Sequence, residues 1–107
     1  MTVKPKLSTY KEKLMTSMVD VLITYDISGK NSEVKAAMLA LGYKDSAHKA
    51  GTSYALPNST LWKRVILTRT PLADLEKVAA RLEVIVERAF TTRISRWKAI
   101  PGEANED

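Results

Sequence analysis

The stretch from Met18 to Lys35, MVDVLITYDISGKNSEVK, decides the fold that this sequence predicts. Every second residue of its first half is apolar or aromatic: Val19, Val21, Ile23 and Tyr25. This period of two residues is typical of a strand with one buried face. A turn follows around Gly29, and apolar residues then recur at helical spacing from Val34 onward. We therefore expect a strand that ends on Asp26, followed by a helix.

Outward from this stretch, the pattern predicts six further segments. They are a helix from Asn31 to Gly42, a loop over 43–51, strands over 52–56 and 60–69 joined by a turn at Pro57, a helix with an apolar face up to Ala89, and a strand over 91–100. This order is that of the ferredoxin-like βαββαβ sandwich. We expect an α+β fold with a four-stranded antiparallel sheet, two helices on one face, and the first and third strands at its centre.

The domain is expected to span residues 19–100. Residues 1–18 form either a basic N-terminal arm or a short additional helix, because Thr9 and Glu12 match a capping box. Residues 101–107 are polar and acidic and are expected to be a flexible tail. Apolar residues point both ways from the central strands, so the free sheet face predicts a partner, either a second copy in a homodimer or another protein.

Composition narrows the classes of function. The chain has 107 residues, 17 Lys and Arg against 12 Asp and Glu, a net charge of +5, a single histidine and no cysteine. The absence of cysteine excludes disulfides and thiolate metal sites. Any metal would therefore be held by oxygen ligands, as magnesium is. The positive charge favours RNA or DNA as a partner. Without an apolar run of roughly 20 residues, we expect a cytoplasmic protein with no membrane association.

Asp26 is the first candidate site residue, on the strand face opposite Val21 and Ile23. In a two-fold dimer, its two copies would approach each other and hold a divalent cation such as magnesium. Such a cation polarises a phosphate and generates a hydroxide nucleophile, which makes Asp26 both a metal ligand and a catalytic residue. Alternatively, its carboxylate accepts hydrogen bonds from backbone N–H groups of the following turn.

Cations interleaved with tryptophans form the second candidate site. Trp62 and Trp97 lie among six basic residues: Lys63, Arg64, Arg69, Arg93, Arg96 and Lys98. Guanidinium groups contact phosphates and indole rings stack on bases, so this set predicts nucleic-acid binding. Strand alternation would divide the set between two faces, however, and buried tryptophans ringed by solvated charges are the alternative. His48 is interpreted as a surface loop residue rather than a catalytic base.

Four segments carry a resemblance to a known superfamily. They are LITYD at 22–26, LGY at 41–43, LPNSTLW at 56–62 and TPLADLEKVAARL at 70–82. With these segments the chain resembles the superfamily of the small CRISPR spacer-acquisition protein, which includes VapD-type toxins and SinR-like proteins. The resemblance implies a ferredoxin-like homodimer that acts on or binds nucleic acid. In members described as metal-dependent nucleases, the acid that ends the first strand is the metal ligand, and it corresponds to Asp26.

These observations predict a dimeric nucleic-acid-binding protein with a magnesium-dependent endonuclease or endoribonuclease activity at Asp26. The alternative is a catalytically inert interaction or homodimerisation module of the same fold. A small-ligand sensor is a third interpretation, although the chain lacks a glycine-rich or aspartate-rich ligand loop. Salt-dependent binding would separate the first class from the second, because phosphate contacts release counterions.

Overall fold

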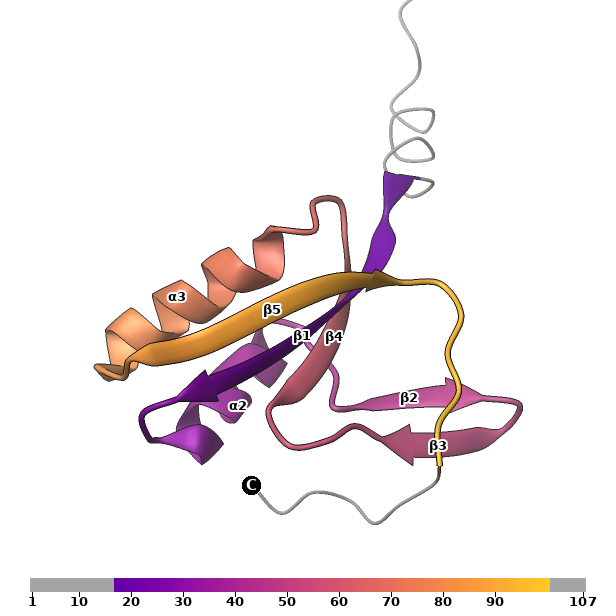
Figure 1. Ribbon diagram of the computed structural model, residues 1–107, viewed down its shortest axis with the longest axis horizontal. Helices are drawn as coiled ribbons and strands as arrows, with labels where there is room; N and C mark the ends of the chain where they lie inside the picture. The colour runs from indigo at the N-terminus through magenta and orange to yellow at the C-terminus, as the bar shows by residue number, and fades with distance from the viewer. Residues whose placement is uncertain (1–16, 101–107) are drawn as a thin grey trace, which may run out of the picture.

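The protein is described by a computed structural model over residues 17–100 (Figure 1). The expected N-terminal arm, apart from its last two residues, and the expected acidic tail lie outside this range. The elements in chain order are β1 (Val19–Ile27), α2 (Asn31–Ala40), β2 (Ser46–Lys49), β3 (Thr52–Ala55), β4 (Thr60–Val65), α3 (Thr70–Leu82) and β5 (Val86–Ile94). The expectation of an α+β fold with antiparallel sheets is confirmed. In the described part of the chain, no helix combines the length and the apolar character needed to cross a membrane.

Strand β1 is the centre of the molecule, as its sequence pattern predicts. It pairs antiparallel with β4 on one side and with β5 on the other, so the sheet order is β4-β1-β5. Val21, Ile23 and Tyr25 are buried, and Ile23 and Tyr25 share a core cluster with residues of both helices. Met38 of α2 and Leu75 of α3 are fully buried in the same core. The two helices therefore cover one face of this sheet, and the opposite face carries the alternate residues of β1.

The four-stranded sheet that the sequence predicts is not formed among the described residues. Strand β3 pairs with β2 as a separate two-stranded hairpin, and not with β4 across the turn at Pro57. The segment 43–51, expected to be a loop, contains β2. The reason lies in the turn between the strands. Ala50 and Gly51 have φ values of 50° and 80°, the left-handed pair that matches the twist of a two-residue hairpin.

One residue still occupies the fourth position of the sheet. The Lys44 N–H donates to the Trp62 carbonyl at 2.9 Å, and the Trp62 N–H donates to the Lys44 carbonyl at 3.0 Å. The Leu56 N–H then donates to the Asp45 carbonyl at 2.9 Å and closes the base of the hairpin. Beyond this point the β2–β3 hairpin projects away from the sheet, on the side of the view opposite α3 (Figure 1). Strand β4 is consequently an edge strand and not a central one.

Three element boundaries also differ from the predicted ones. Helix α3 ends at Leu82 rather than near Ala89, β5 spans Val86–Ile94 rather than 91–100, and β4 ends at Val65 rather than Arg69. The helix ends because Glu83 adopts a left-handed conformation, with φ 58°. The Val84 N–H then donates to the Ala79 carbonyl at 2.9 Å, which is a Schellman-type helix end. The apolar residues that follow continue the buried pattern on a strand.

Candidate nucleic-acid interface

The face of the three-stranded sheet that points away from the helices is called here the open face. Its residues include Asp20, Leu22 and Asp26 of β1, Trp62 and Arg64 of β4, and Arg88, Phe90 and Ile94 of β5. One end of this face carries Leu22, Trp62 and Ile94. There the face, the hairpin and the segment 97–100 together line a cavity of about 340 Å³. At the other end it is uncovered, and Phe90 is 61% exposed.

Both tryptophans of the chain line this cavity, which we call the aromatic cavity. The Trp62 Nε1 donates to the Ser46 carbonyl at 2.7 Å and so ties β4 to β2. The Trp97 ring meets the Tyr54 ring edge-on, with centroids 5.5 Å apart. The predicted alternation of Arg96, Trp97 and Lys98 between two strand faces does not apply, because β5 ends at Ile94. The chain is then free to turn, and Trp97 reaches the hairpin.

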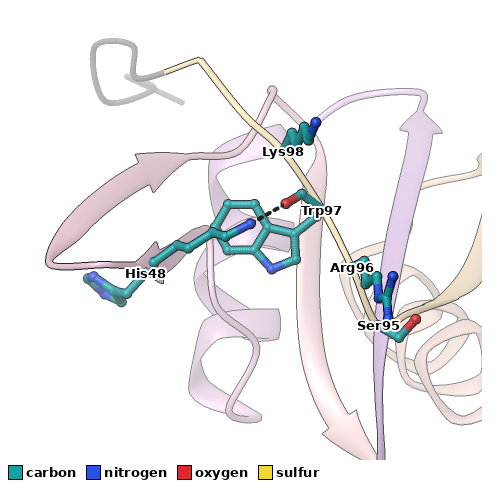
Figure 2. Close-up of a pocket in the computed structure, with 6 residues that line it drawn as sticks. His48, Ser95, Arg96, Trp97 and Lys98 are labelled. Atoms are coloured by element: carbon teal, nitrogen blue, oxygen red, sulfur yellow. Dashed lines mark hydrogen bonds between the residues drawn. The ribbon is translucent and has the colours of Figure 1, made fainter.

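A second cavity, of about 560 Å³, lies on the cationic side of Trp97 (Figure 2). We call it the basic pocket, and its lining residues are His48, Lys49, Ser95, Arg96, Trp97 and Lys98. The Lys49 Nζ donates to the Trp97 carbonyl at 2.9 Å, the bond drawn as a dashed line in Figure 2. It also lies 5.3 Å from the centre of the Trp97 ring. No acidic residue is among these lining residues.

The six basic residues predicted from sequence fall into three places. Arg96 and Lys98 line the basic pocket. Lys63 and Arg64 border a separate groove with Lys44 and Trp62. Lys63 Nζ donates to the Leu41 carbonyl at 2.5 Å, and Arg64 pairs with Asp20 at 3.0 Å. These contacts hold both cations at the surface of the sheet.

The remaining two predicted cations are not part of this group. Arg69 directly precedes α3, and Arg93 lies opposite Val21 on the helix side of β5. Neither borders the aromatic cavity, the basic pocket or the groove beside Trp62. The structure therefore brings four of the six predicted cations to the end of the sheet that carries both tryptophans.

Asp26 lies on the open face, as expected, but at the end opposite Trp62. Asp20 and Asp26 are six positions apart on β1, which corresponds to about 20 Å along an extended strand. The Asp26 Oδ2 is 2.7 Å from the Arg88 Nη2, and both side chains are exposed. The following turn is held by Ser28, whose N–H donates to the Ile85 carbonyl at 2.9 Å. The carboxylate thus has a guanidinium partner, which neither sequence interpretation included.

Within residues 17–100, Asp26 is not part of a cluster of metal-binding side chains. Magnesium needs several oxygen ligands in near-octahedral arrangement. Between residues 17 and 100 there is no group of three or more His, Cys, Asp or Glu side chains that could hold a metal. Asp26 supplies one carboxylate, and Arg88 already offsets its charge.

Sequence reasoning did not identify Lys44, Lys49 and Tyr54 as members of the site. The hairpin that carries Lys49 and Tyr54 consists of two strands of four residues each, too short for a clear alternation. A usable signal was the Gly51 that follows Ala50, since glycine favours tight hairpin turns. His48 is exposed, as predicted for a surface residue, although it lies on β2 and not in a loop.

Comparison of the chain with protein-family models, with curated proteins and with solved structures finds no match. The geometry of the site is therefore the guide to its chemistry. Two features stand out at one end of the sheet. Cations from the hairpin and from residues 96–98 surround one face of Trp97, and an apolar cavity adjoins the same residue.

Proposed function

We propose that this protein binds nucleic acid, with the basic pocket as its phosphate contact. The observation that carries the proposal is the set of three cations, Lys49, Arg96 and Lys98, that line one pocket with the Trp97 indole. Guanidinium and ammonium groups bind phosphate oxygens through charge-assisted hydrogen bonds. Each phosphate contact also releases condensed counterions and so favours binding at low salt. The net charge of +5 acts in the same direction.

A second group of cations supports a binding surface longer than one pocket. Lys44 and Arg64 border the groove beside Trp62, and the Lys44 Nζ lies 4.8 Å from the centre of that ring. The groove and the basic pocket adjoin the same end of the sheet through Trp62 and Trp97. A chain of several nucleotides that runs across the base of the hairpin would meet cations at both ends of its path.

We further propose that the fold derives from the ferredoxin-like sandwich. The order β4-β1-β5 and the placement of both helices on one face agree with that origin. The bridge between Lys44 and Trp62 would then be the remnant of the strand that is missing beside β4. The β2–β3 hairpin would replace the rest of that strand. Together with this derivation, we propose that the chain forms a homodimer and belongs to the CRISPR spacer-acquisition superfamily. Its rival is an inert module that binds a protein or a second copy through the open face.

The test is salt-dependent binding of a labelled single-stranded oligonucleotide by two matched double variants. Arg96→Gln/Lys98→Gln removes two cations of the basic pocket, and Lys77→Gln/Arg81→Gln removes two exposed cations of α3. Lys49 is kept, because its bond to Trp97 is structural. We expect the pocket variant to bind about tenfold more weakly at low salt and to lower the salt slope by about 1.4, whereas the α3 variant changes little.

Two results would contradict the proposal in different ways. Equal losses in the two double variants would show that binding follows overall charge and not the basic pocket. No binding of RNA or DNA by the wild-type protein, even at low salt, would favour the interaction module. The basic charge would then serve solubility.

A further inference from the structure

The aromatic cavity adds a feature that phosphate binding alone does not use. Its volume of about 340 Å³ lies at the small end of the range for ligand pockets. Its walls are mainly apolar and aromatic, and its lining residues include Leu22, Tyr54, Leu56, Trp62, Ile94 and Trp97. Such a cavity suits a flat ring of limited size better than a long or charged ligand.

Trp97 and Lys98 line both the aromatic cavity and the basic pocket. Beside Trp97, the basic pocket is lined by Lys49 and Arg96, and the aromatic cavity by Tyr54, Trp62 and Ile94. A ligand that occupies both cavities must therefore combine an anionic part with an apolar ring a few ångströms away. A nucleotide unit within a strand has this construction, with its phosphate beside its base.

We infer that the aromatic cavity receives one unpaired nucleobase while a flanking phosphate lies in the basic pocket, so that the protein prefers single-stranded nucleic acid. This inference rests on the proposed function. Every base has a π face and stacks on indole rings without sequence preference. A base inside a duplex is paired and stacked, and its removal from the stack has an energetic cost. A duplex would therefore lose the cavity contact and keep only the phosphate contact.

The rings are held in place before any ligand arrives. The Ser46 carbonyl fixes the Trp62 indole through its Nε1, and the edge of Tyr54 abuts Trp97. The Lys49 ammonium orients Trp97 from the opposite side. Asp20, which lines a small cavity together with both tryptophans, is paired with Arg64 at 3.0 Å. Preorganised rings lose little conformational entropy when a base stacks on them.

The experiment compares three labelled probes of equal length: a single-stranded oligothymidylate, an abasic strand with the same phosphates, and a duplex. Because both tryptophans of the chain line the cavity, intrinsic fluorescence reports stacking directly. We expect oligothymidylate to bind about tenfold more tightly than the other two probes. We also expect only oligothymidylate to quench the tryptophan emission.

Two variants separate the cavity from the basic pocket. Trp97→Leu should reduce the preference for bases, but it could also disturb the packing of residues 97–100. Ala47→Leu leaves every aromatic ring and cation in place and fills the cavity from β2, where Ala47 is a lining residue. We expect Ala47→Leu to bind oligothymidylate as weakly as the abasic strand, with abasic binding unchanged.

The outcomes distinguish this inference from the proposed function. Equal affinity for the abasic and thymidylate strands, or tighter binding of the duplex, would overturn the inference and leave phosphate binding intact. Unchanged preference in Ala47→Leu would also overturn it. Failure of all three probes to bind at low salt would overturn the proposed function itself.

Discussion

At the scale of single residues, Tyr43 connects α3 to β4. Its hydroxyl donates to the Asp74 carboxylate of α3 at 2.7 Å, and its ring lies under the Lys63 ammonium of β4 at 5.2 Å. The side chain is only 3% exposed. Burial, and then the hydrogen bond and charge of Asp74, raise the pKa of Tyr43 well above that of a free tyrosine. The folded state therefore favours the protonated phenol.

This raised pKa predicts a specific loss of stability in alkali. The unfolded chain releases the Tyr43 proton near pH 10, whereas the folded chain retains it at higher pH. The contribution of Tyr43 is therefore complete below pH 10. Above it, the free energy of unfolding should fall by up to about 1.4 kcal/mol per pH unit, until the pH reaches the folded-state pKa.

Urea unfolding of wild type and Tyr43→Phe at several pH values measures this effect. At neutral pH, Tyr43→Phe should be about 1–2 kcal/mol less stable, because Asp74 loses its hydrogen-bond donor. Above pH 10 the difference should shrink, since the variant has no phenol to ionise. A difference that stays constant across this range would contradict the role given to Tyr43.

Asp26 supports a second prediction at this scale. We expect Asp26→Asn to leave oligonucleotide binding unchanged, because the basic pocket lies at the other end of β1. Any magnesium-dependent cleavage should be lost, since an amide is a poorer ligand for the hard cation. Gel assays of wild type and variant, with magnesium and with chelator, test both statements. Cleavage that persists in the variant would rule out the metal role of Asp26.

The location of Asp26 on the open face could be predicted from alternation in β1, but its partner could not. Arg88 lies 62 residues further along the chain, and the sequence assigned that region to the end of a helix. Trp62 and Trp97 could be recognised as candidate site residues from the sequence, because tryptophan is rare and aromatic. That they share one cavity depends on where β5 ends, which no local pattern shows.

At the scale of elements, β1 and the start of both helices follow from their patterns. Strong periodicity makes such segments predictable. The β2–β3 hairpin was missed because its strands are short and its turn carries Ala50 where asparagine is preferred. Helix α3 was extended too far because Ile85, Val86 and Ala89 continue its apolar pattern in the sequence. The left-handed Glu83 that ends the helix carries a side chain with no helix-stopping tendency of its own.

The turn of the hairpin gives a prediction of its own. Ala50 adopts φ 50°, which strains a residue with a Cβ, and asparagine tolerates this region better. We expect Ala50→Asn to stabilise the protein by about 0.5–1 kcal/mol. Ala50→Val should destabilise it by a similar amount, because a β-branched residue fits a positive φ poorly. Thermal unfolding of the three proteins tests this order, and stability unaffected by either change would mean that the hairpin unfolds separately from the core.

At the scale of the whole molecule, the open face is covered at one end only. Phe90 is 61% exposed at the uncovered end, on the same face as Asp26 and Arg88. An exposed aromatic side chain beside an ion pair is a suitable centre for a two-fold interface. The homodimer stays a prediction, and Phe90 is the residue on which we expect it to depend.

Sedimentation velocity can test this interface. We expect the wild type to sediment as a dimer and Phe90→Lys as a monomer, because a buried unpaired charge at the centre of an interface is costly. Ile85→Lys is the matched control, since Ile85 is 69% exposed but precedes β5 and lies outside the open face. A wild-type monomer, or a dimer in all three proteins, would contradict an interface at Phe90.

The attachment of the hairpin has a consequence for how this protein can change over time. The chain leaves the body at Asp45 and returns at Leu56, and one hydrogen bond of 2.9 Å holds these two points together. Because a segment with adjoining ends tolerates changes in length at small entropic cost, the ten residues between them form an exchangeable insert. Descendants of this chain could acquire new ligands by rewriting that insert while inheriting the packed helices and the central strand unaltered.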